Sequence, residues 1–160
     1  MKKILSVLLC LTILAVCAGC AGTSPAAQST ADVDLAAAMQ TIRAQVELPE
    51  MMDLTNENLL DYFGIEESLF SQAAACVNAN GYEKEEILLL QAVDSSAVSQ
   101  LTTQLEQSLQ NAAEEMQNYL PEQYAMIRDS RVETSGLYVW LFVSNSNEQI
   151  REIWNDCLNA

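Results

Sequence analysis

Glu86–Val93 (EILLLQAV) and Leu137–Val143 (LYVWLFV) are the two apolar runs that decide the fold of this chain. The turn signal Asn78–Gly81 (NANG) precedes the first run, and Ser135–Gly136 precedes the second. Short continuous apolar runs between turn signals are typical of buried strands. We therefore expect a strand in each run, and a hairpin in which Arg131–Thr134 pairs with the second one.

Each of these strands is followed by a polar cap and an amphipathic helix. Asp94, Ser95 and Ser96 cap the longer helix, which stops before Pro121, and Pro121 can itself open a further turn. Asn145 or Ser146 caps the last helix. Apolar positions three or four residues apart predict one buried face on each helix. These positions are Val98, Leu101, Leu105, Leu109, Ala112 and Met116 in the first, and Ile150, Ile153, Trp154 and Cys157 in the second.

The first half of the chain predicts two shorter helices. Asp34 is the N-cap of the first helix. Met51–Leu54 leads into the second, which Thr55 caps and Gly64 ends. Ser68–Val77 (SLFSQAAACV) is assigned as a strand, although its strand propensity is low. The apolar positions are Leu35, Met39, Ile42 and Val46 in the first helix, and Leu59, Leu60 and Phe63 in the second.

Together these elements predict one α+β domain over residues 32–160. We expect a four-stranded antiparallel sheet with helices packed on one face, preceded by the two N-terminal helices. Ile87–Leu90 stands at the same distance from Val98 as Val139–Phe142 does from Ile150. This spacing fits a ββα–ββα pseudo-repeat, and it fits equally a coincidence between two strand–helix units.

The first 20 residues have the organisation of an export signal. Two lysines precede the apolar run Ile4–Val16, which is shorter than the roughly 20 residues that a membrane span needs. Ala18–Cys20 resembles the bacterial lipobox, whose cysteine receives a diacylglyceryl group before the signal is cleaved. Cys17 stands where a lipobox usually has leucine, and it is itself a poorer acceptor because the bulky Val16 would occupy the cleavage position.

The lipobox predicts a signal peptide over residues 1–19, lipidation of Cys20 and a flexible tether over residues 20–31. Two acyl chains would then anchor the protein stably on the extracytoplasmic face of the cell membrane. Two other interpretations stay open from the sequence: an uncleaved N-terminal helix, and an ordinary secreted protein that is cut near Ala21.

Composition excludes several classes of function. Without residues 1–19 the chain keeps 5 basic and 22 acidic residues, a formal charge of −17 that repels nucleic acids and anionic headgroups. There is no histidine, which excludes Ser-His-Asp and Cys-His catalysis and zinc sites with histidine ligands. Acid–base chemistry would have to use carboxylates, Lys84 or tyrosines. A phosphate-binding glycine loop, a Cys-x-x-Cys pair and an EF-hand loop are also missing, so we expect no catalytic residues and no cofactor.

Acidic clusters are the remaining candidates for metal binding or acid–base work. Carboxylates that follow one another in one turn diverge, so we expect no metal site among them. Glu114 and Glu115 are adjacent on a helix and point about 100° apart, which argues against a catalytic pair. The acidic candidates for a metal site are Glu83, Glu85, Glu86 and Asp94.

Aromatic residues supply one candidate binding surface. Tyr119, Pro121 and Tyr124 lie at a helix break, where they could form an aromatic-edged surface or a hydrophobic contact across the break. Trp140 and Trp154 fall on core-like positions, and we interpret them as packing residues.

Cys76 and Cys157 are the cysteines that remain once the signal is removed and Cys20 is lipidated. Outside the cytoplasm they could form a disulfide, which would close a loop of ~80 residues. Because nothing local brings the two positions together, we favour two small buried thiols.

Four segments resemble a known family in their order and spacing. They are Met51–Leu54 (MMDL), Asp61–Ile65 (DYFGI), Tyr119–Tyr124 (YLPEQY) and Gly136–Val139 (GLYV). The family is the domain of unknown function 4358, found in short bacterial lipoproteins, and the resemblance extends over Asp34–Leu158. It implies the lipoprotein location and carries no activity, so no catalytic residue is assigned from it.

From these observations we expect a non-enzymatic, membrane-anchored lipoprotein that binds a protein, a peptide or a component of the cell envelope. The alternative is an envelope enzyme that uses carboxylates, or an accessory subunit of one. Nucleic acid is not an expected partner.

Overall fold

The computed structural model describes residues 32–160. The predicted signal peptide over residues 1–19, the lipidated Cys20 and the tether over residues 20–31 lie outside the described residues.

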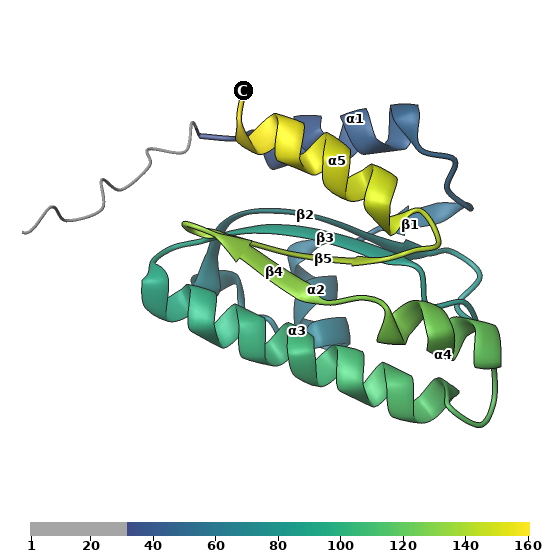
Figure 1. The fold of residues 1–160 in the computed structure, drawn as a ribbon. Coiled ribbons are helices and arrows are strands. Elements are labelled where there is room, and N and C mark those ends of the chain that lie inside the picture. Colours follow the sequence, from purple (N-terminus) through teal and green to yellow (C-terminus); the bar gives the residue numbers. More distant parts are fainter. Residues whose placement is uncertain (1–31) are drawn as a thin grey trace, which may run out of the picture.

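One antiparallel sheet of five strands forms the centre of a mixed α/β structure with five α-helices (Figure 1). A 3-10 turn, Glu67–Leu69, precedes the second strand. In chain order the elements are α1 (Leu35–Gln45), β1 (Met51–Asp53), α2 (Asn56–Phe63), β2 (Phe70–Asn78), β3 (Glu86–Ala92), α3 (Ser95–Met116), α4 (Pro121–Arg128), β4 (Val132–Ser135), β5 (Tyr138–Val143) and α5 (Asn147–Leu158).

The strand that the sequence analysis missed is β1. The sheet order is β1-β2-β3-β5-β4, so β1 forms one edge, where Met51 pairs with Asn78 and Asp53 with Cys76. The prediction of four strands is therefore wrong by one. A three-residue strand is too short to show an alternating pattern, and only its pairing with the end of β2 defines it.

Helices cover both faces of the sheet, which corrects the prediction that they pack on one face (Figure 1). Leu88 and Leu90 of β3 contact the side formed by α2, α3 and α4. Ile87 and Leu89 of the same strand face α1 and α5. A strand without polar alternation needs cover on both faces, because either face would otherwise leave a row of apolar side chains in water.

The ββα order does occur twice, as β2-β3-α3 and as β4-β5-α5, with α4 inserted between the two units. The two helices nevertheless lie on opposite faces of the sheet. The spacing that aligns Ile87 with Val139 also pairs residues of opposite orientation, since Ile87 faces α1 and Val139 faces α3. The similarity is therefore one of strand–helix order and not of a symmetric repeat.

The predicted caps at Asp34, Thr55 and Asp94 and the helix end at Gly64 are confirmed, whereas Ser146 occupies the N-cap of α5 without a side-chain hydrogen bond. The side chain of Asp34 accepts a hydrogen bond from the Ala37 amide at 3.0 Å, and Asp94 does the same for Ala97 at 2.8 Å. Thr55 caps α2 in a capping box, and Gly64 ends that helix with a φ of 68°, a left-handed conformation that favours glycine. Trp140 and Trp154 are buried in the core beneath α1 and α5, as their positions predicted.

The N-terminal end of the described chain lies at one end of the sheet. The Asp32 carboxylate accepts hydrogen bonds from the side-chain amides of Gln72 and Gln91. Asn78, where β2 ends, is six residues beyond Gln72, or about 20 Å away at ~3.3 Å per strand residue. The loop that follows β2 is therefore at the end of the domain opposite to residue 32 (Figure 1).

Candidate functional site

A groove of about 570 Å³ opens between the loop that joins β2 to β3 and the start of α4. We call it the hairpin groove. Tyr82 in the loop is 76% exposed, and Tyr119, immediately before the groove residue Leu120, is 75% exposed. The lining residues are Asn80, Tyr82, Glu83, Leu120, Pro121, Glu122 and Gln123.

The loop side of the hairpin groove is shaped by two asparagines. The side-chain oxygen of Asn78 accepts from the Asn80 amide, and that of Asn80 accepts from the amides of Tyr82 and Glu83. Gly81 supplies the left-handed residue of the turn, with a φ of 72°. These bonds fix the backbone on both sides of Tyr82, so its exposed ring is carried on a defined turn.

The two walls of the groove are joined through Lys84. Its backbone amide donates to Oε1 of Gln123 on α4 at 2.8 Å, and its ammonium group lies 2.9 Å from a carboxylate oxygen of Glu115 on α3. The loop is thereby attached to both helices, which favours a preformed groove over one that must be ordered on binding.

Carboxylates dominate the electrostatics here. Glu83 accepts hydrogen bonds from the side-chain amides of Asn78, at 2.8 Å, and Asn80, at 3.1 Å. Burial raises the pKa of Glu85, and the nearby charge of Glu83 raises it further, while a hydrogen bond from Asn78 opposes the shift. Burial raises the pKa of Glu86 to about 7, partly offset by the positive charge of Lys84.

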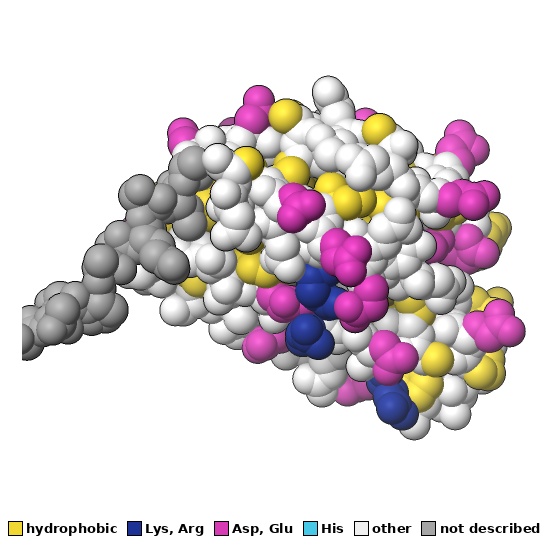
Figure 2. Space-filling view, turned by 45° about the horizontal axis from the view of Figure 1, so that its top comes forward, with side chains coloured by type: hydrophobic (Ala, Val, Ile, Leu, Met, Phe, Trp, Pro, Cys, Tyr) yellow, Lys and Arg dark blue, Asp and Glu magenta, His cyan; other side chains and the backbone are white. Residues whose placement is uncertain are grey.

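Acidic side chains are scattered over the face shown in Figure 2, and the few Lys and Arg side chains lie among them. All five basic residues of the described chain already have partners within it. Four are in ion pairs: Arg43 with Asp53, Lys84 with Glu115, and Arg131 and Arg151 with Glu133. The fifth, Arg128, lies over the ring of Tyr124 at 5.8 Å from its centroid.

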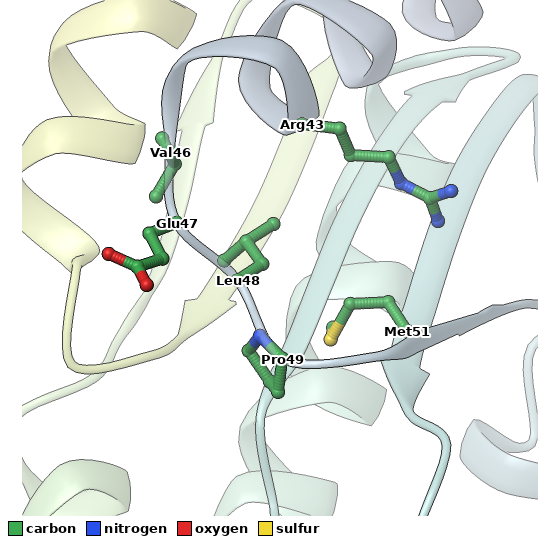
Figure 3. A pocket seen from close by; sticks show the side chains of 6 residues that line it. All are labelled: Arg43, Val46, Glu47, Leu48, Pro49 and Met51. Carbon is green, nitrogen blue, oxygen red and sulfur yellow. The ribbon is translucent and has the colours of Figure 1, made fainter.

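Two other pockets are smaller. One, of about 320 Å³, lies at the connection from α1 to β1, where Figure 3 shows Arg43 and Glu47 extending to opposite sides of Leu48 and Pro49. The other, of about 370 Å³, lies between α2 and α3 and is lined by Tyr62 and Phe63 together with uncharged polar side chains of α3. Neither combines exposed aromatic rings with free carboxylates on two walls.

The acidic candidates for a metal site do not converge. Glu83 and Glu85 both accept from the Asn78 amide, whereas Asp94 lies beyond the other end of β3 and caps α3. Within residues 32–160, no group of three or more Cys, Asp or Glu side chains is arranged to hold a metal ion. Glu115 pairs with Lys84, and Glu114 accepts a hydrogen bond from Gln110, so these neighbours act separately.

The three residues predicted to form an aromatic-edged surface at the helix break do not lie on one surface. Pro121 lines the hairpin groove and Tyr119 is exposed beside it, while Tyr124 packs against the core. Tyr82, the most exposed of these rings, was missed. Only its position after Asn80–Gly81, a turn signal that places a side chain at a loop tip, could have indicated it.

Cys76 and Cys157 are both free thiols. Cys76 is fully buried, with its sulfur 3.9 Å from the Met39 sulfur, and Cys157 is partly exposed on α5. Burial raises the pKa of both thiols, opposed at Cys76 by the charge of Arg43.

We expect alkylation of the native protein without reductant to modify Cys157 slowly and Cys76 only after unfolding. Intact mass before and after denaturation measures both steps. A disulfide would leave both cysteines unmodified even in denaturant, and that result would contradict the structure.

Comparison with family models matches residues 44–144 to a domain of unknown function (DUF4358). Comparison with curated proteins and with solved structures gives no match. Within residues 32–160, none of the helices has the length and apolar character to cross a membrane.

Proposed function

Because the chain belongs to the DUF4358 family, and because its sequence begins with a lipobox-like signal, we propose that it is a lipid-anchored module of the cell envelope that binds a protein or peptide in the hairpin groove. The observation that carries this proposal is the exposed aromatic groove itself. Its walls are fixed to each other, yet Tyr82 and Tyr119 remain in solvent.

The position of the groove supports binding of a partner that lies away from the membrane surface. Residue 32, through which the chain leads back to Cys20, lies at the opposite end of the sheet from Tyr82. A partner in the hairpin groove would therefore approach the end of the domain that points away from the tether attachment. The negative charge of the domain adds repulsion from anionic headgroups, which favours a domain held away from the bilayer.

The composition of the groove supports a protein partner. Large apolar or aromatic side chains surrounded by polar ones form the centres of most protein interfaces, and tyrosine is among the residues that contribute most. Tyr82, Leu120 and Pro121 supply such a centre, and Asn80 and Gln123 supply polar neighbours.

The alternative function, a carboxylate-dependent enzyme, has less support. An acid–base residue needs a pKa near the working pH, and burial raises the pKa of Glu86 to about 7, which makes Glu86 the first candidate within residues 32–160. Glu86 is mostly buried and alternates along β3 with the core residues Leu88 and Leu90 on the face that α3 covers. It is not among the groove residues, so it lacks access to a substrate bound there.

The proposal predicts site-specific crosslinking of the anchored protein in its native membrane. A photoreactive phenylalanine analogue at position 82 or 119 should give one discrete adduct, and the Tyr82→Ala exchange should lower the yield from position 119 about tenfold, as loss of an interface hot spot does. Adduct yield on a gel, followed by peptide mapping of the attached segment, measures this.

Tyr62 provides the matched control, since it is an exposed tyrosine on α2, outside the hairpin groove, with 54% of its surface accessible. The same analogue at position 62 should give no such adduct. Equal adducts from positions 62 and 82, or no adduct from 82 and 119, would contradict binding in the groove.

A further inference from the structure

We propose that the segment bound in the hairpin groove carries lysine or arginine side chains, so that the ligand class is a basic peptide. This inference rests on the proposed function and specifies its ligand. It is carried by an aromatic groove that has carboxylates on both walls, while every Lys and Arg within residues 32–160 is engaged with another partner.

Glu83 stands on the loop wall and Glu122 on the α4 wall. Glu83 has two amide donors but no basic partner, and Glu122 forms no ion pair with any residue of the described chain. All five basic residues of this part of the chain are engaged elsewhere, so none of them neutralises Glu83 or Glu122, and a basic partner would supply the missing positive charge.

The apolar surface of the groove matches the rest of a basic side chain. A lysine or arginine has a long apolar stem and a charged end, and it covers apolar surface while its charge stays near water or a carboxylate. Leu120 and Pro121 can contact such a stem, and the face of Tyr82 can attract the cation itself. The same chemistry already occurs on α4, where Arg128 lies over the ring of Tyr124.

Other ligand classes fit less well. An anionic segment would face the repulsion of Glu83 and Glu122 within the groove and of the acidic surface beyond it. A purely apolar segment would cover these carboxylates without a partner, which costs free energy because it removes water from a charge. A basic segment is the one class that compensates both carboxylates while it contacts the apolar groove.

Binding of synthetic peptides to the full-length lipidated protein in detergent micelles tests the inference. The probes are an end-blocked nonapeptide of alternating lysine and alanine, and the same peptide with every lysine acetylated. By fluorescence anisotropy, we expect the lysine peptide to bind at least about tenfold more tightly than the acetylated one and to weaken as salt rises.

A pair of double variants separates groove binding from general attraction to an acidic protein. Glu83→Gln with Glu122→Gln should weaken lysine-peptide binding about fivefold or more. Glu57→Gln with Glu106→Gln removes the same charge from exposed positions on α2 and α3, and should change binding less than about twofold. Circular dichroism and thermal unfolding establish that each variant is folded.

Three outcomes would overturn the inference: no binding of the lysine peptide, equal weakening by both double variants, or equal binding of the acetylated peptide. Equal binding of the acetylated peptide would leave the proposed function intact if Tyr82→Ala still lowered the crosslink yield from position 119 about tenfold. Absence of the crosslinked adduct from positions 82 and 119 would instead contradict the proposed function.

Discussion

Replacing Cys20 with serine is expected to release the protein from membranes. A serine cannot accept the diacylglyceryl group through a thioether, so the variant would lack the acyl chains that supply anchoring at ~0.8 kcal/mol per buried CH2. Because this free energy is summed over two chains, the expected change is from nearly complete membrane association to nearly none. Fractionation after an alkaline wash, with the intact mass of the mature chain, measures both the location and the lipid adduct.

Cys17→Ser is the matched control, since it removes the neighbouring thiol and leaves the acceptor in place. This variant should keep the lipid adduct and the membrane association of the natural chain. Cys20→Ser that stays in the washed membrane at the mass of the processed chain, without residues 1–19, would contradict the lipoprotein proposal, whereas a natural chain that carries no lipid and keeps residues 1–19 would favour an uncleaved N-terminal helix. Full release of the natural chain would favour an ordinary secreted protein.

The geometry of the domain separates the groove from the point where the tether is attached. Released protein should bind the lysine peptide as tightly as the anchored protein does, because the groove lies at the far end of the domain from residue 32 and is lined by residues of the β2–β3 loop and the start of α4. What anchoring changes is the effective concentration of the groove near partners on the same membrane.

Local signals in the sequence were enough to place most elements. The Asp94 cap, the Thr55 cap and the Gly64 end each depend on a few neighbouring residues, and each is where its pattern predicted it. The apolar runs that became β3 and β5 were identified for the same reason, because a continuous apolar stretch between turn signals specifies a buried strand without reference to the rest of the chain.

The features that the sequence did not predict are those that depend on contacts between distant segments. Three residues do not specify β1, and it exists because Met51–Asp53 lies against the end of β2. The cover on both faces of the sheet could have been inferred from the sequence, because the consecutive apolar residues Ile87–Leu90 place apolar side chains on both faces. All four are fully buried in the structure.

The hairpin groove depends on a contact between residues that are even further apart in the sequence. Glu83 and Glu122 are brought to facing walls because the Lys84 amide binds Gln123, a contact between positions 39 residues apart. The sequence located Pro121 at a helix break and Asn80–Gly81 at a turn, but nothing local indicated that the two would meet.

Glu86→Gln is expected to stabilise the protein at pH 8 and to remove part of the pH dependence of its stability. Burial favours the protonated form of Glu86 in the folded state, which raises its pKa from 4.5 to about 7. A folded-state pKa above the unfolded value means that the folded chain binds the proton more tightly. The contribution of Glu86 to the free energy of unfolding is therefore fully present below about pH 4.5 and declines as the pH rises to about 7. Above that pH the contribution stays at its lower level.

Glutamine resembles the protonated carboxyl in shape and carries no charge at any pH, so the variant avoids this loss. From a shift of this size we expect a gain of up to about 3 kcal/mol in the free energy of unfolding at pH 8, and little change near pH 5. Urea unfolding of both proteins between pH 5 and 8, with the exposed Glu106→Gln on α3 as control for the loss of one negative charge, measures the difference. Parallel stability curves for the natural chain and Glu86→Gln across this range would show that Glu86 ionises freely in the folded protein, and the buried position of its carboxyl on the α3 face would then be wrong.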